Sequence, residues 1–241
     1  MKRKDLFKNY IETQYKEQTD FSINKIRLEF NTYDRNFKKF LPCNKNVKIL
    51  EIGFGTGYFL KYLLENGYRN IYGIELSDEE TEFVKKNVHN NVECVDETEK
   101  FLDKHQNEYD FICMFQVLEH IPKSETINLL KKIRASLRNN GIFIATVPNS
   151  SNPFNIFAFG ADFTHEFIFN AKSLAQVNKL AAFSDTQIYP CREENLSWHS
   201  KITNITAPIF HFLLKIFVGL NRCYLSPNDF YTKNLLCVCR K

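Results

Sequence analysis

Three glycines and two acidic residues form the part of this sequence whose types and spacing are best suited to binding a ligand. Gly53, Gly55 and Gly57 alternate with other residues directly after Glu51. Glycines at such a turn let the backbone adopt positive φ and come close to a bound molecule. Glu75 lies 20 residues after Gly55, where a carboxylate can accept hydrogen bonds from both hydroxyls of a ribose. We therefore expect an adenosine-bearing ligand at this turn.

The spacing of the glycines distinguishes between two classes of adenosine cofactor. A dinucleotide fingerprint, G-x-G-x-x-G, that begins at Gly53 requires its third glycine at position 58, which is Tyr58. The order E-x-G-x-G-x-G instead resembles the first motif of class I S-adenosylmethionine-dependent methyltransferases, and the resemblance extends over 47–184. It implies S-adenosylmethionine as the cofactor, bound by Glu51 and the glycines, with Leu76 expected against the adenine.

Two further loops are expected to contact the cofactor. Asp96 follows a predicted strand at 91–95, in the loop where members of the family contact the adenine amino group, so the resemblance implies that role for Asp96. Phe115 and Gln116 lie at the end of a predicted strand at 109–115. Open α/β sheets bind ligands at the carboxyl ends of their strands, so both side chains should face the cofactor.

Candidate catalytic groups follow the same strand. Gln116, Glu119 and His120 have the i, i+3, i+4 spacing that places side chains on one face of a helical turn. His165 lies after the next predicted strand, so both imidazoles can reach one edge of the sheet. A neutral imidazole near pH 7 suits removal of a hydroxyl proton, with Glu119 to fix its tautomer. We predict catalytic roles for His120, His165 and Glu119.

This stretch also resembles the ubiquinone-biosynthesis O-methyltransferase branch and the small-RNA 2′-O-methyltransferases. There an E-x-x-E-H unit and a later histidine can bind a divalent metal. Gln116 stands in place of the first glutamate and removes one anionic ligand. We therefore predict no metal among the site residues; a Glu–His–His set completed by water is the alternative.

The rest of the chain has the pattern of a fold that positions these residues. Apolar, β-branched runs alternate with segments of helical period. The resemblance implies an α/β fold, a Rossmann-like, mostly parallel sheet of seven strands with helices on both faces, whose closing strand is antiparallel. We predict strands at 47–52, 70–75, 91–95, 109–115, 141–147, 184–189 and 234–240, and helices at 57–66, 77–88, after Pro122 and at 172–182. Residues 151–170 show neither period and are expected to form a loop on the acceptor side.

Both ends of the chain are expected to add helices. Residues 1–41 contain an apolar stripe at helical spacing, and we assign them to an N-terminal helical cap. Residues 42–241 form the predicted methyltransferase domain. Within it, 198–222 is an apolar segment too short to cross a bilayer, expected to be a helical insertion or lid. The stripe consists of Ile23, Ile26, Phe30, Tyr33, Phe37 and Phe40.

Composition places the chain among globular proteins. Its 241 residues are 44% hydrophobic, enough for one domain with a large core. No transmembrane segment or signal peptide is recognisable, and the seven cysteines show no metal-binding spacing. We therefore expect a cytoplasmic protein with reduced thiols. The net charge is +4 with no recognised nucleic-acid-binding module, so DNA is not expected and RNA is not favoured; the oligomeric state stays open.

From this resemblance we expect that the protein transfers a methyl group from S-adenosylmethionine to an oxygen of a small-molecule acceptor. Similarity to methyltransferases of such pathways favours a sugar or phosphoryl-bearing precursor of a surface polysaccharide. A quinone-type phenol, the 2′-oxygen of an RNA, and a catalytically silent adenosine-binding partner protein are the alternatives.

Overall fold

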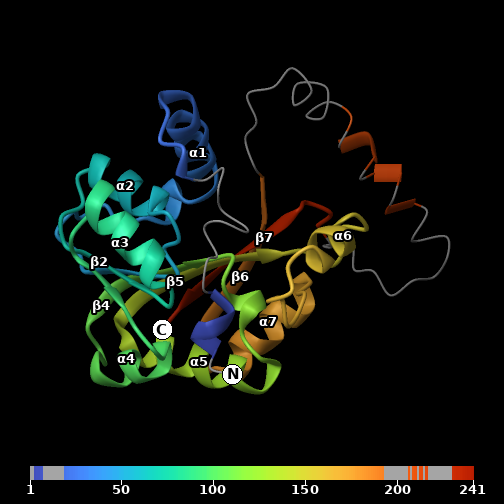
Figure 1. The fold of residues 1–241 in the computed structure, drawn as a ribbon. Helices are drawn as coiled ribbons and strands as arrows, with labels where there is room; N and C mark the ends of the chain where they lie inside the picture. Colours follow the sequence, from blue (N-terminus) through green and yellow to red (C-terminus); the bar gives the residue numbers. More distant parts are fainter. Residues whose placement is uncertain are drawn as a thin grey trace.

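The computed structural model describes residues 3–7, 19–192, 206, 208–210, 212, 213, 215, 216 and 230–241. Its strands are β1 (Ile49–Ile52), β2 (Ile71–Glu75), β3 (Val92–Cys94), β4 (Tyr109–Phe115), β5 (Leu137–Pro148), β6 (Asp185–Cys191) and β7 (Asn234–Arg240). They form one sheet in the order β3-β2-β1-β4-β5-β7-β6 (Figure 1). The first five strands of this order pair in parallel, and β7 is antiparallel to β5 and β6. The predicted seven-stranded, mostly parallel sheet is confirmed.

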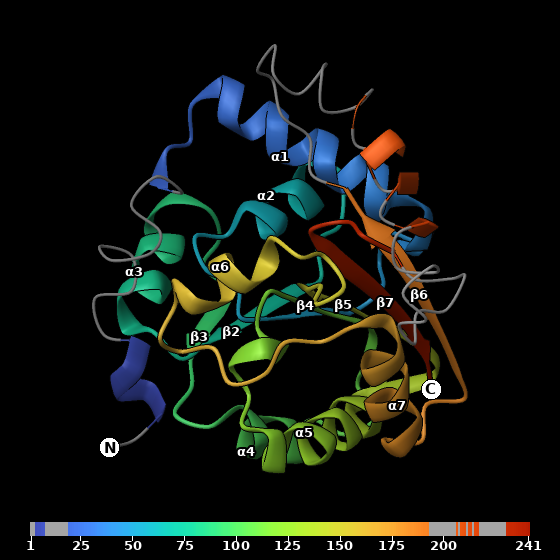
Figure 2. The same cartoon turned by 90° about the vertical axis from the view of Figure 1, so that its right-hand side faces the viewer.

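Helices cover both faces of the sheet. α1, α2 and α3 lie on one face, and α4, α5 and α7 lie on the other, as the two views in Figures 1 and 2 show. The bounds of the helices and single turns are η1 (Arg3–Phe7), α1 (Ile23–Asn36), η4 (Lys38–Phe40), α2 (Tyr58–Glu65), α3 (Asp78–Asn87), α4 (Thr98–Lys104), η5 (Leu118–His120), α5 (Lys123–Ser136), α6 (Asn155–Gly160) and α7 (Ala171–Leu180).

Each face of the sheet has its own apolar core. One core joins the strands to α4, α5 and α7 and contains Leu129, Leu130 and Ile133, none of which has exposed surface. The other joins them to α1, α2 and α3 through an aromatic group around Phe37 and Phe59. Burying each such side chain stabilises the fold by about 1.5–3 kcal/mol. The central strands are therefore held from both sides, and their carboxyl ends form a rigid edge.

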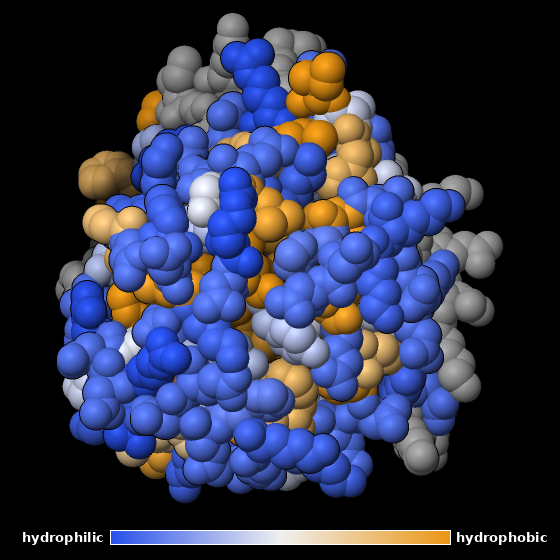
Figure 3. Space-filling model, turned by 90° about the vertical axis from the view of Figure 1, so that its left-hand side faces the viewer, coloured by the Kyte–Doolittle hydropathy of each residue, from blue (hydrophilic) through white to orange (hydrophobic). Residues whose placement is uncertain are grey.

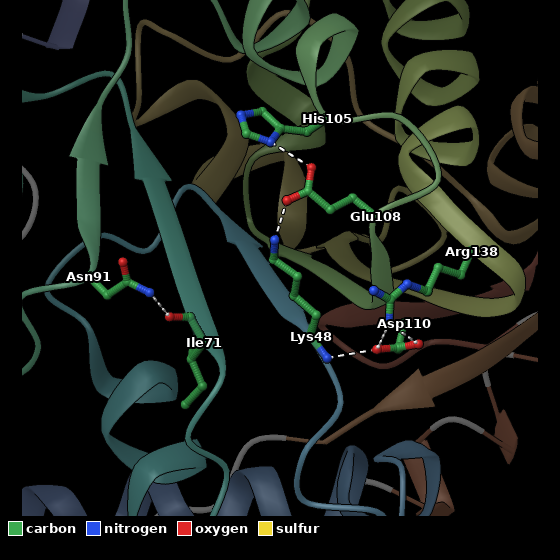
Figure 4. A network of polar contacts seen from close by, with 7 residues as sticks. All are labelled: Lys48, Ile71, Asn91, His105, Glu108, Asp110 and Arg138. Atoms are coloured by element: carbon green, nitrogen blue, oxygen red, sulfur yellow. Dashed lines mark hydrogen bonds and ion pairs between the residues drawn. The ribbon is translucent and has the colours of Figure 1, made fainter.

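Polar contacts secure the opposite edge of the sheet, where the strands begin (Figure 4). The Lys48 N–H donates to Asp110 Oδ2 at 2.7 Å, and Arg138 pairs with the same carboxylate at 2.9 Å. Glu108 accepts a bond from His105 Nδ1 at 2.7 Å and pairs with the Lys48 ammonium. This network ties the starts of β1, β4 and β5 together, so the ionisable groups at this edge have a structural role.

The structure differs from the sequence prediction in several elements. α4 and the short α6 form where no helix was predicted, and β5 begins at Leu137 instead of 141. In the predicted apolar stripe, Ile23 is 84% exposed, because it is the first residue of α1. The face shown in Figure 3 is largely hydrophilic, with apolar residues visible between the charged ones.

The predicted insertion at 198–222 lies mostly outside the described residues. The eight residues described there, between 206 and 216, are helical. Within the parts of the chain that the structure describes, no helix has the length and apolar character needed to cross a membrane.

Candidate functional site

The glycine loop between β1 and α2 has the backbone that the sequence requires. Gly53, Gly55 and Gly57 adopt φ of +73°, +53° and +84°, a region that residues with a Cβ rarely enter. A Cβ added to Gly53 would lie 2.3 Å from Val117 Cγ2. Near Gly55, by contrast, the nearest atom to an added Cβ is Glu80 Oε1 at 3.8 Å. The loop is therefore closely packed at Gly53 and open to a ligand at Gly55.

Glu75 is held at the end of β2 by this loop. Its Oε2 accepts the Gly55 N–H at 3.2 Å, and its Oε1 accepts the Leu76 N–H at 2.7 Å. Each carboxylate oxygen can accept a second bond, so Glu75 can still receive the hydroxyls of a ribose. Six of the predicted cofactor residues line one pocket at this position, namely Gly53, Gly55, Glu75, Leu76, Phe115 and Gln116.

Three carboxyl groups surround the glycine loop and set its charge preference. Burial, with the nearby Glu75, raises the pKa of Glu51 well above its usual range, and the same causes raise the pKa of Glu80 to about 9. Glu51 Oε2 is buried and has no hydrogen-bond partner among the described residues. Glu51 also lines the adjoining cleft, which has a volume of about 720 Å³. A cationic ligand such as the sulfonium of S-adenosylmethionine would favour the ionised form of these carboxyls, whereas the pyrophosphate of a dinucleotide would oppose it.

Two of the predicted cofactor residues lie outside this lining. Gly57 is buried behind the loop as the residue before α2, where an added Cβ would lie 3.0 Å from Val84 on α3. The glycine at 57 therefore serves close packing of α2 on α3. The Asp96 side chain is 85% exposed and pairs with Lys4 at 3.3 Å. The adenine contact assigned to Asp96 stays a prediction.

The structure brings the three predicted catalytic residues together beside the cleft. One ligand atom from each of Glu119, His120 and His165 lies within 4.8 Å of the others, and the two imidazole centroids are 4.7 Å apart. Main-chain bonds fix the two segments: Glu119 O accepts the N–H groups of Glu166 at 2.8 Å and Phe167 at 3.1 Å. The loop after β5 is thereby fastened to the turn after β4.

Thr164 and Asp162 orient His120. Thr164 Oγ1 donates its proton to Asp162 Oδ1 at 2.6 Å and contacts His120 Nδ1 at 2.8 Å. Since a hydroxyl has one proton, its oxygen accepts the Nδ1–H of His120, and the ring lone pair is on Nε2. His165 Nδ1 donates to Phe159 O at 2.9 Å, which gives His165 the same tautomer. Both imidazoles can thus accept a proton or bind a metal through Nε2.

Sequence reasoning missed Asp162 and Thr164. A local signal does exist, because Asp-x-Thr can form a turn in which the Asp side chain accepts the N–H two residues later. This bond is present, from the Thr164 N–H to Asp162 Oδ1 at 2.9 Å. The contact of Thr164 with His120, 44 positions away in the sequence, depends on the fold.

Glu119 is the acidic residue of this cluster, and its carboxyl is shielded from solvent. It is buried, and its Oε2 has no hydrogen-bond partner among the described residues. Burial, together with the charge of Asp162, raises the pKa of Glu119 to about 8. A metal ion would reverse this effect and hold the carboxylate ionised. The Glu119, His120 and His165 set therefore fits a divalent cation as well as a proton-transfer role.

The comparisons with known proteins agree with this architecture. A family model described as a methyltransferase domain matches residues 26–188. No curated protein matches the chain. The chain is similar to the structure of an S-adenosylmethionine-dependent methyltransferase from Archaeoglobus fulgidus, with 19% identity, a TM-score of 0.64, and coverage of 90% of this chain and 94% of that one.

Two further structures share the fold. One is a possible histamine N-methyltransferase from Thermotoga maritima, with 16% identity, a TM-score of 0.65, and coverage of 98% and 99% of the two chains. The other is a phosphoethanolamine N-methyltransferase from Haemonchus contortus in complex with phosphomonomethylethanolamine and S-adenosylhomocysteine, with 16% identity, a TM-score of 0.57, and coverage of 100% of this chain and 61% of that one. Because the family model spans more than half of the chain, the protein belongs to the methyltransferase domain family and uses S-adenosylmethionine as its methyl donor.

Proposed function

We propose that this methyltransferase transfers its methyl group to an oxygen of a small molecule, with His120 as the general base. The observation that carries the proposal is the hydrogen-bonded series from His120 Nδ1 through Thr164 Oγ1 to Asp162 Oδ1. Asp162 and Thr164 fix the tautomer of His120 and stabilise the imidazolium that forms when Nε2 takes a hydroxyl proton. A neutral amine is nucleophilic as it stands, whereas a hydroxyl becomes a good nucleophile only when a base removes its proton.

The walls of the cleft support an acceptor with both polar and apolar parts. Tyr33, Phe115, Phe159 and Lys233 are among the residues that line it. Aromatic residues suit the apolar faces of a sugar, and a lysine suits an acidic group. We propose a sugar or phosphoryl-bearing precursor of a surface polysaccharide, modified in the cytoplasm. Within the described part of the chain, Cys43, Cys94, Cys113, Cys237 and Cys239 form no disulfide, which supports a reducing compartment.

A second candidate is metal-assisted transfer by the same cluster. The close approach of Glu119, His120 and His165 within 4.8 Å supports it. A divalent cation held there would lower the pKa of a bound acceptor hydroxyl. Thr164 would then orient a metal ligand instead of a base.

Turnover by site variants tests the proposal. With labelled S-adenosylmethionine, we would measure turnover of nucleotide sugars, phenols and RNA, with and without chelator. For a base, we expect His120→Ala to lower turnover about 100-fold and Thr164→Val to lower it less, with affinity for S-adenosylhomocysteine unchanged. His89→Ala, outside the cleft, is the control. Loss of activity in chelator and its return with Mg²⁺ or Mn²⁺ would favour the metal. Full activity of the His120→Ala, His165→Ala double variant would refute both versions.

A further inference from the structure

The N-terminal turn η1 lies against the cofactor pocket, although it is far from the glycine loop in sequence. Phe7 lines the pocket together with Glu75 and Leu76. Its ring also meets the imidazole of His120 edge to face, with centroids 5.8 Å apart. Figure 2 shows this turn, in dark blue, next to α3. Phe7 therefore borders both the pocket and the catalytic cluster.

Lys4 attaches the same turn to two loops at the carboxyl edge of the sheet. Its ammonium lies 3.1 Å from Asp78, the first residue of α3, and 3.3 Å from Asp96, in the loop between β3 and α4. These two segments follow β2, which ends at Glu75, and β3, its neighbour in the sheet. The turn thus extends from both loops on one side to His120 on the other.

We propose that Lys4 and Phe7 complete the cofactor pocket. Phe7 forms the wall between the adenosine side and the catalytic cluster, where it contributes apolar contact and excludes water. Lys4 holds this wall in place, and the carboxylate of Asp96 serves as its anchor. The inference depends on the cofactor of the family alone and is independent of the acceptor.

Phe7 and Lys4 should contribute unequally to the affinity for the cofactor. Asp78 and Asp96 are 75% and 85% exposed at their side chains, so their attraction to Lys4 is reduced by solvent and screened further by salt. The Phe7 ring contacts the pocket directly, and its contribution should be insensitive to salt. Salt dependence therefore distinguishes the role of the ion pairs from that of the ring.

Calorimetric titration of the full-length chain with S-adenosylhomocysteine tests the proposal. We expect Phe7→Ala to raise the Kd about tenfold at any salt concentration, with Phe7→Leu in between. We expect Lys4→Ala to raise it about threefold in low salt, with the difference lost at high salt. Lys100→Ala, which removes an exposed cation paired with Glu97 instead of Asp96, should leave the Kd unchanged.

Several results would overturn the proposal. An unchanged Kd in both Phe7→Ala and Lys4→Ala would show that η1 contributes nothing to the pocket. A lower Kd in Phe7→Ala would show that the ring takes the place of the ligand. If Phe7→Ala does not fold, as judged by thermal unfolding without ligand, the Lys4→Glu variant and its repair by Asp78→Lys provide the test. Wild-type binding without turnover of any acceptor would refute only the proposed function.

Discussion

Glu75 offers the most direct test of how the cofactor is held. Its carboxylate is fixed by the N–H groups of Gly55 and Leu76 at 3.2 and 2.7 Å. Replacement by alanine removes the acceptor of the two expected ribose bonds while leaving the rest of the pocket lining in place. Hydrogen bonds to a charged group contribute about 1.5–3 kcal/mol each, and the net loss on removing one partner is about 1–3 kcal/mol. This corresponds to a rise in Kd of about 5- to 150-fold.

The assay is calorimetric titration with S-adenosylhomocysteine, accompanied by thermal unfolding without ligand. Glu79→Ala is the matched control, because Glu79 is exposed on α3 four positions further along the chain. Glu75→Ala also removes the acceptor from two main-chain N–H groups, so the unfolding measurement shows whether the loop survives. A Kd for Glu75→Ala within twofold of wild type, with the fold intact, would refute the placement of the ribose on Glu75.

Two further predictions concern the glycine loop. Burial and Glu75 raise the pKa of Glu80 to about 9. The folded state therefore keeps a proton that the unfolded chain releases above about pH 4.5. This stabilisation is complete below pH 4.5 and is lost as the pH rises to 9. The Tm without ligand should therefore fall over this range, less steeply in Glu80→Gln, and equal slopes would contradict the reasoning. Gly53→Ala should lower the free energy of unfolding by more than Gly67→Ala, which has φ of +88° but no atom within 4 Å of an added Cβ. The difference, about 1–3 kcal/mol in denaturant unfolding, reports the clash with Val117, and no difference would show that Val117 moves aside.

The sequence predicts best those elements whose signal is local and repeated. β4 and β7 have the predicted bounds, because each is a continuous apolar run that becomes a buried strand. The glycine loop could also be predicted from the sequence, because positive φ and close packing restrict the residue types at Gly53. In contrast, α6 lies in a phenylalanine-rich stretch in which Phe154 and Phe157 are 62% and 75% exposed, so no buried stripe marks it as a helix.

In the candidate site, too, some residues could be placed from local sequence signals and others only from the fold. The sequence predicts that six of the proposed cofactor residues lie together, and they line one pocket, because strand ends in an α/β sheet converge on one edge. The partner of His120 could not be placed in this way, because Thr164 reaches it only after the loop beyond β5 is fastened to Glu119 by main-chain bonds. Likewise, Phe7 and Lys4 carry no periodic signal, and their positions depend on contacts with α3 and the loop after β3.

Gln116 lines both the candidate cofactor pocket and the cleft that contains Glu119, His120 and His165. It has φ of +53°, a conformation that costs a residue with a side chain about 1–2 kcal/mol. Two bonds to Thr146 on β5 hold it there: its N–H donates to Thr146 O at 3.0 Å, and its Nε2 donates to Thr146 Oγ1 at 3.1 Å. The chain therefore turns sharply at the end of β4, and η5 directs Glu119 and His120 into the cleft beside the pocket. A glutamate at 116 would lack the Nε2–H that bonds Thr146. The amide that removes one candidate metal ligand therefore also secures the turn that positions His120, the proposed base.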